Sequence, residues 1–132
     1  MATINRSYDA EAQIIGAGDN YITLAAANSH TATSSTIDLT AKAGVAIFAE
    51  FNFVAEHTDD GVISIYGSYD DANYDDIAVS QLSVTGVDST ARQASFVIES
   101  GYPYIQIKAT QSGTTDDDPV RAYTRTFTWT SA

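Results

Sequence analysis

The chain has 132 residues, no cysteine and a net charge of -11, from 17 Asp and Glu against six Lys and Arg. This charge repels a phosphate backbone, and the lack of cysteine excludes disulfides and thiolate metal sites, so nucleic acid is not an expected partner. The start lacks a signal-peptide layout, and no segment approaches the roughly 18 apolar residues of a membrane helix. We therefore expect a single domain, made in the cytoplasm, with no membrane partner.

The first part of the chain predicts short strands after a polar arm. Residues 1–10 read as a flexible N-terminal arm, and the remaining residues, 11–132, as the folded domain. The expected early strands lie at 12–17, 21–25 and 36–39, with a loop at 26–35.

The longest apolar run predicts a central hairpin. Between Val45 and Glu56 the residues alternate with a period of two, which is the period of a strand, and one side carries Val45, Ile47, Ala49, Phe51, Phe53 and Ala55. Asp60-Gly61 follows, a dipeptide that tolerates positive φ and favours a hairpin turn, and residues 62–66 are extended again. The pattern indicates that these two strands pair with each other.

The second half of the chain also predicts short strands separated by turns. A turn-rich link at 67–76 predicts a second hairpin between 62–66 and 77–84, and later strands are expected at 93–99, 104–109 and 120–130. No segment has the period of an amphipathic helix. About eight or nine short strands separated by turns predict an all-β, single-domain antiparallel β-sandwich or jelly roll.

One acidic loop resembles the start of a calcium-binding loop. Asp71, Asn73 and Asp75 give the pattern D-x-N-x-D, which supplies several oxygens to a hard cation. An EF-hand is excluded because the sixth position is Asp76 rather than glycine and the twelfth is Leu82 rather than glutamate. Two alternatives remain, a looser calcium site and a solvated hairpin tip whose Asp and Asn residues suit turn geometry.

No arrangement of residues predicts catalysis. The carboxylates that a glycosidase would need lie in turns, and the two histidines, His30 and His57, stand apart in polar loops. The sequence contains no G-x-S-x-G elbow, phosphate-binding glycine loop or H-E-x-x-H motif. We therefore expect neither an enzyme nor a cofactor.

The last strand carries the most informative side chains. Alternation places on one face the residues Arg121, Tyr123, Arg125, Phe127 and Trp129. Arginine with tryptophan and tyrosine is the composition of interface anchors. The alternatives are that the aromatic rings fill the core, that the face is an exposed contact strip, or that it forms the aromatic platform of a carbohydrate-binding module.

Two stretches carry a family resemblance. They are ISIYGSYDDANYDDIAV at 63–79 and FVIESGYPYIQIKATQSGTTDDDPVRAYTRTFTW at 96–129. They resemble small β-sandwich structural proteins of tailed-bacteriophage virions, in which a strand ending in Gly-Ser precedes an acidic turn and a Gly-Tyr-x-Tyr strand precedes a polar loop and a final strand.

The resemblance implies a capsid decoration, or cement, protein on the exterior of the virion. Its implied partners are the major capsid protein and further copies of itself, with a trimer as one option. Contacts would lie on the final strand, 121–129, and on the arm from Ile4 to Tyr8. A head-tail connector, tail or fibre component is the nearest alternative, and a carbohydrate-binding module the more distant one.

Overall fold

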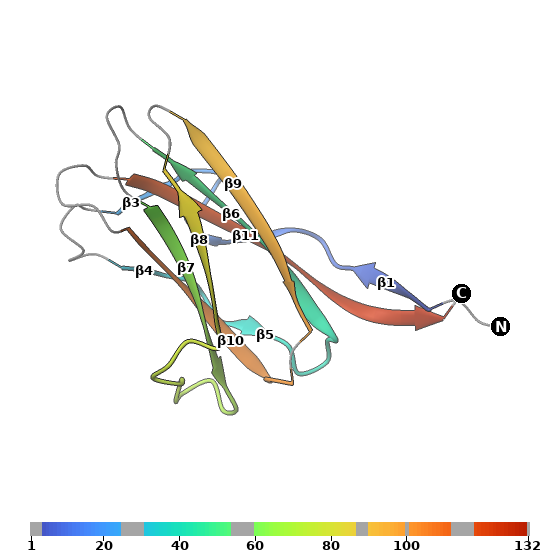
Figure 1. The fold of residues 1–132 in the computed structure, drawn as a ribbon. Coiled ribbons are helices and arrows are strands. Elements are labelled where there is room, and N and C mark those ends of the chain that lie inside the picture. The colour runs from blue at the N-terminus through green and yellow to red at the C-terminus, as the bar shows by residue number, and fades with distance from the viewer. Residues whose placement is uncertain are drawn as a thin grey trace.

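The computed structural model describes residues 4–24, 31–53, 60–86, 90–99, 101–111 and 118–131. Within these ranges the chain forms two antiparallel sheets that pack face to face (Figure 1). The predicted all-β sandwich is confirmed, with eleven strands rather than eight or nine because the first third is divided into five short ones. In this described part of the chain, no helix is long and apolar enough to cross a membrane.

Each sheet is built around one long strand of the second half of the chain. The six-stranded sheet has the order β1-β11-β6-β9, and β2 and β3 also pair with β11. Its strands are β1 (Ile4–Tyr8), β2 (Ala12–Ile15), β3 (Ile22–Leu24), β6 (Gly44–Asn52), β9 (Ala91–Ile98) and β11 (Asp118–Ser131). The five-stranded sheet has the order β4-β10-β7-β8, and β5 also pairs with β10. Its strands are β4 (Ala32–Thr33), β5 (Ile37–Asp38), β7 (Asp60–Ser68), β8 (Ser80–Thr85) and β10 (Tyr104–Gln111).

The pairing is nested along the chain. The pair β7 and β8 is the innermost; β6 pairs with β9, β4 and β5 pair with β10, and β1 to β3 pair with β11. One long hairpin rolled so that successive pairs alternate between two sheets is a jelly roll. The predicted second hairpin, β7 with β8, is confirmed.

The predicted central hairpin is wrong. β6 and β7 lie in different sheets, so the chain crosses the sandwich between them. Asp60 and Gly61 are not a turn but the start of β7, where Gly61 pairs with Val84 and Gln111. A Cβ on Gly61 would lie 2.6 Å from the ring of Phe51, on the facing sheet. Position 61 therefore requires glycine because of packing and not because of a turn. In the sequence, the resulting Asp-Gly pair cannot be distinguished from a hairpin turn.

The core lies between the sheets and follows the predicted alternation. Along β6 and just after it, the inward residues are fully or almost fully buried: Val45, Ile47, Ala49, Phe51 and Phe53. Ile105, Ile107 and Ala109 of β10 meet them from the other sheet and are also fully buried. On β9 the predicted face of Ala94, Phe96 and Ile98 packs against this core.

The N-terminal arm contains a strand. β1 pairs with the end of β11 from Ile4 opposite Ser131 to Tyr8 opposite Phe127. Figure 1 shows this two-stranded ribbon extending past the body of the sandwich. The predicted loop at 26–35 holds β4 in its second half. His30, His57 and Ala55, like most of the polar loop at 111–119, lie outside the described residues.

The contact at Gly61 gives a stability prediction. We expect Gly61→Ala to lower the free energy of unfolding by about 1–3 kcal/mol, because the added methyl group overpacks the core against Phe51. Gly101 is the matched control, since a Cβ there meets no atom within 4 Å, and Gly101→Ala should stay within about 0.5 kcal/mol of the parent. Urea unfolding of the three proteins measures both. Equal stability of the two variants would contradict the packing argument.

Candidate functional site

The last strand separates its side chains into an inner and an outer set. Val120 and Ala122 belong to the core between the sheets, and Thr124 is buried on the same side. The five predicted residues occupy the opposite, outer face of β11: Arg121, Tyr123, Arg125, Phe127 and Trp129. We call this row the β11 strip. That the five share a face is confirmed, and that face does not point into the core. Their role as contacts stays a prediction.

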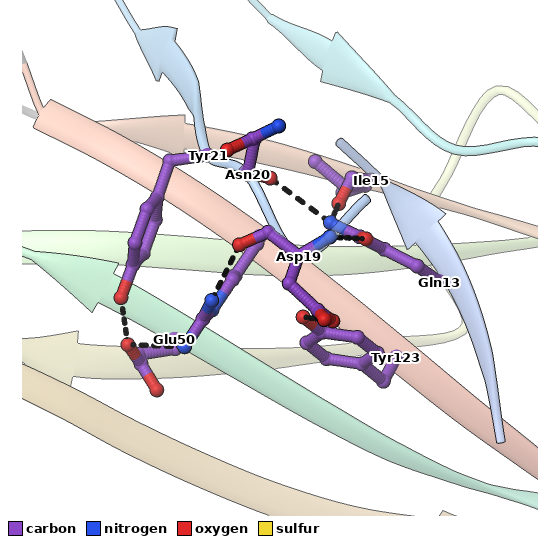
Figure 2. A network of polar contacts seen from close by, with 8 residues as sticks. Gln13, Ile15, Asp19, Asn20, Tyr21, Glu50 and Tyr123 are labelled. Atoms are coloured by element: carbon purple, nitrogen blue, oxygen red, sulfur yellow. Dashed lines mark hydrogen bonds and ion pairs between the residues drawn. The ribbon is translucent and has the colours of Figure 1, made fainter. Parts of the chain in front are cut away.

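A polar network holds the first half of the β11 strip (Figure 2). Arg121 donates to the backbone oxygen of Asp19 at 2.6 Å and pairs with Glu50 at 3.3 Å. Its guanidinium stacks on the ring of Tyr21, 4.4 Å from the centroid, and Tyr21 donates its hydroxyl to Glu50. The hydroxyl of Tyr123 donates to the Asp19 carboxylate at 2.7 Å. These bonds fix Arg121 and Tyr123 in one conformation.

The network also shifts the titration of its phenols. Burial, followed by the hydrogen bond to Glu50, raises the pKa of Tyr21. The hydrogen bond to Asp19 raises the pKa of Tyr123. Both phenols therefore remain protonated donors at neutral pH. The Nε of Arg121 is buried and has no hydrogen-bond partner within the described ranges.

A tight turn between β2 and β3 aims Asp19 at the strip. Asp19 adopts a φ of 65°, and Gly16 and Gly18 are also left-handed. The side chain of Gln13 spans the turn, since its Oε1 accepts from the Asp19 amide at 2.8 Å and its Nε2 donates to the Asn20 oxygen at 2.9 Å. In the sequence this segment indicated only the end of a strand, and no motif pointed to Gln13 or Asp19.

The second half of the β11 strip lies on the projecting ribbon. The ring of Phe127 contacts those of Tyr8 and Trp129, with centroids 5.4 and 5.8 Å away, and the Arg6 guanidinium lies 4.8 Å from the Phe127 centroid. These neighbours bury Phe127 completely, on the outer side of the sheet, while 40% of Tyr8 and 48% of Trp129 stay exposed. Gly44 leaves room for the Phe127 ring.

The ribbon has little support from the rest of the sandwich. β6 begins at Gly44, opposite Phe127, so within the described residues the last four of β11 pair only with β1. A two-stranded ribbon is marginally stable in water by itself. The aromatic contacts with Arg6 and Phe127 therefore stabilise it at its base.

Positive charge gathers at the base of the ribbon. Arg6 pairs with Glu99, Lys42 pairs with Asp9 at 2.7 Å, and Arg125 donates its Nε to the Asp9 backbone oxygen at 2.7 Å. The Lys42 contact, together with a bond from Thr126, lowers the pKa of Asp9. Three of the six Lys and Arg residues lie at this end of the molecule.

A shallow hollow adjoins the β11 strip on the outer face of the same sheet. It has a volume of about 310 Å³, and its lining residues are Tyr8, Ala46, Phe48, Ser95, Phe96, Val97 and Arg125. It is mainly apolar, and its polar side-chain groups belong to Arg125, Ser95 and the hydroxyl of Tyr8. Sequence reasoning did not find Phe48, because Phe48 lies on the side of β6 opposite the predicted apolar row.

Several side-chain oxygens of the acidic loop already accept hydrogen bonds from other residues of the chain. Of the calcium candidates, Asn73 donates its side-chain amide to Asp70 at 2.8 Å, and Asp71 accepts from the hydroxyls of Thr36 and Tyr74. Among the described residues, no three His, Cys, Asp or Glu side chains are grouped so that they could hold a metal ion. The arrangement within this loop fits the solvated-tip alternative better than a cation site.

Comparison with known proteins shows the fold alone. No family model matches the chain, and no curated protein matches it. A structure of Bacillus endospore appendages, which form disulfide-linked pili, matches with a TM-score of 0.47 and 16% identity over 97% of this chain and 90% of that one. A naturally empty cowpea mosaic virus particle matches with a TM-score of 0.44 and 9% identity over 100% of this chain and 86% of that one.

One further solved structure matches with a higher TM-score. The Clostridium thermocellum xylanase 10B chain with CBM22-1 and GH10 modules, in complex with xylohexaose, matches with a TM-score of 0.55 and 12% identity. The match covers 93% of this chain but only 25% of that one. At such low sequence identities, these structural matches show only that the chain is a β-sandwich. They say nothing about its partner.

The turn at Asp70 gives a pH-dependent prediction. Asp70 accepts from the amides of Asn73 and Ala72 at 2.8 and 3.0 Å, and these bonds hold its pKa well below the usual 3.8. A lowered folded-state pKa stabilises the fold above pH 3.8, and the effect disappears as the pH falls through the folded-state pKa. Asp70→Asn should therefore lower the melting temperature at pH 7, and the deficit should shrink below about pH 4.

Asp76→Asn is the control for this prediction. It removes the same charge from the same loop but none of the bonds to the Asp70 carboxylate. Thermal melts of both variants at pH 7 and in acid compare them. A deficit for Asp70→Asn that does not change with pH would contradict the assignment.

Proposed function

We propose that the chain is a non-enzymatic structural protein that decorates the exterior of a virion head and docks on the major capsid protein. The observation that carries this proposal is the β11 strip, a row of arginine and aromatic side chains on the outer face of a sheet. No strand among the described residues covers it. Arginine, tyrosine and tryptophan contribute most to binding at interface centres.

The polar side chains of the β11 strip are preorganised for binding. Arg121 and Tyr123 are already fixed by Asp19 and Glu50, so little side-chain entropy remains to be lost when a surface covers them. Arg125 is held in the same way by the Asp9 backbone. Preorganised polar groups of this kind favour a rigid partner surface, as a capsid shell would provide.

The virion part of the proposal rests on the sequence. The stretches 63–79 and 96–129 resemble small structural proteins of tailed bacteriophages, and a net charge of -11 keeps the protein away from packaged DNA. A decoration protein binds a repeating lattice, on which many modest contacts act together, so each copy needs only a small interface. A connector, tail or fibre role uses the same strip on a different part of the particle.

Particle binding tests the proposal. We expect Tyr123→Ala combined with Arg125→Glu to weaken binding to particles at least tenfold, because the double variant removes one anchor and reverses one charge of the strip. Arg92→Glu is the matched control, since it makes the same charge change on the exposed end of β9 and should leave binding unchanged. Sedimentation of purified particles with each protein measures the bound fraction.

The location of the native protein separates the alternatives. In a density gradient of lysate from the source system, mass spectrometry should find the chain with particles in hundreds of copies. A few copies per particle would move the role to the connector, tail or fibre. If the chain stays with free soluble proteins, the virion proposal is wrong.

Carbohydrate binding is the second candidate, and the hollow beside the strip favours it. Tyr8 and Phe48 offer ring surface there, and Arg125 and Ser95 offer hydrogen bonds, the combination that sugars need. If this candidate holds, a glycan array should give a defined set of positives, and Phe48→Ala should abolish them. A blank array would remove it.

A further inference from the structure

The connection between β7 and β8 displays two apolar side chains in solvent. Tyr69 is 81% exposed and Ile77 is 82% exposed, more than any other large apolar residue in the described part of the chain. Val79 beside them is 40% exposed. Figure 1 shows this connection at the end of the sandwich from which the ribbon of β1 and β11 projects, but on the other sheet. Exposed apolar side chains grouped in this way mark interaction sites.

Hydrogen bonds fix the backbone of the connection between β7 and β8. Asp70 caps its first turn through the amides of Ala72 and Asn73. The Asp75 amide donates to the Gly67 oxygen at 3.0 Å, and the Val79 amide donates to the Ile65 oxygen at 2.8 Å. Tyr69 and Ile77 are thus held out by a fixed backbone, which lowers the entropy cost of binding.

A hollow with an acidic rim lies beside Ile77. Its volume is about 440 Å³, and its lining residues are Asp75, Asp76, Ile77, Ala78, Val79 and Tyr102. This size falls within the range of roughly 300–1,000 Å³ that is usual for binding pockets. Residues 69–79 contain four Asp and no Lys or Arg, so the occupant must combine an apolar group with positive charge.

The ribbon of the same chain has this complementary chemistry. Trp129 is 48% exposed at its end, the Arg6 guanidinium lies 5.2 Å from the centroid of the Trp129 rings, and Lys42 and Arg125 lie at its base. Two anions, Glu99 and Asp9, accompany these three cations. In a chain of net charge -11, the ribbon and its base are therefore a local site where cations outnumber anions.

We infer that the acidic hollow beside Ile77 receives the projecting ribbon of a second copy, with Trp129 of one copy against Ile77 and Tyr102 of the next. Arg6 then faces Asp75 and Asp76. The contact joins two different surfaces, so it is head-to-tail and produces either closed rings or open chains. The inference deepens the proposed function, because it names the partner of the ribbon and leaves the sheet part of the β11 strip to the shell.

Two variants, each defective in one surface, test this geometry. Ile77→Asp adds a charge to the hollow, and Trp129→Ala combined with Arg6→Glu removes the aromatic anchor and reverses the charge of the ribbon. Each change lies on an exposed residue, and circular dichroism checks that both proteins fold. Analytical ultracentrifugation of the parent protein should show self-association that increases with concentration. Each variant alone should associate at least tenfold more weakly.

The mixture of the two variants is decisive. Each supplies the surface that the other lacks, so an equimolar mixture should form a one-to-one dimer that does not grow further. Ile22→Asp, a similar change at an exposed position of β3, should associate like the parent. If Trp129→Ala unfolds the ribbon, Arg6→Glu alone with Asp76→Arg provides a charge-reversal pair that should associate only when mixed.

Three outcomes would overturn the inference: a parent protein that stays monomeric at every concentration reached, a variant that associates like the parent, or a mixture that stays monomeric. All measurements use purified protein without particles. If self-association fails while Tyr123→Ala with Arg125→Glu still releases the chain from particles, the inference is wrong and the proposed function stands. If the copies associate as described but no particle binds them, the proposed function is wrong and the head-to-tail contact stands.

Discussion

The pairing of β11 with strands on both of its sides is the constraint on which the rest of the molecule depends. β6 lies along one side, and β1, β2 and β3 follow one another along the other. Because successive side chains of a strand point to opposite faces, the strand that buries Val120 and Ala122 also displays Arg121, Tyr123 and Arg125. A slip of one residue would move the charged side chains into the core, so the register of the core also fixes the β11 strip.

The sequence predicted most strands and their inward residues, but of the strand pairs it predicted only β7 with β8 correctly. A period of two identifies a strand whatever its neighbour is, and β6 and β7 follow each other as closely as the arms of a hairpin would. The information that separates them is the contact between Gly61 and the Phe51 ring across the sandwich. That contact joins two sheets, so no local pattern contains it. β4, which lies in the predicted loop, was missed because its two-residue pairing with β10 leaves almost no periodic signal.

For the candidate site, alternation predicted the shared face but not its direction. Aromatic residues suit the core and an interface equally well, so composition did not decide between them. The decision comes from Glu50 and Asp19, which hold Arg121 and Tyr123 on the outer side and lie far from them in the sequence. Phe127 fits the core alternative and the interface alternative each in part. Its ring is buried, but it lies under Arg6, Tyr8 and Trp129 rather than between the sheets.

The few positive charges of this acidic chain connect distant segments. Arg6 with Glu99, Lys42 with Asp9, and Arg121 with Glu50 each join residues that are at least 30 positions apart in the sequence. The pairs are partly exposed, so each contributes little to stability, and their main effect is to fix where positive charge sits on the surface.

At physiological salt, exposed charges interact over about 8 Å, so two copies with a net charge of -11 respond at contact distance mainly to the charges that face each other. The cations near the ribbon and the carboxylates near Ile77 are therefore able to act locally despite the overall repulsion. In other mutual orientations the acidic surfaces of the two copies face each other at contact distance, so the same net charge that weakens association also makes it selective.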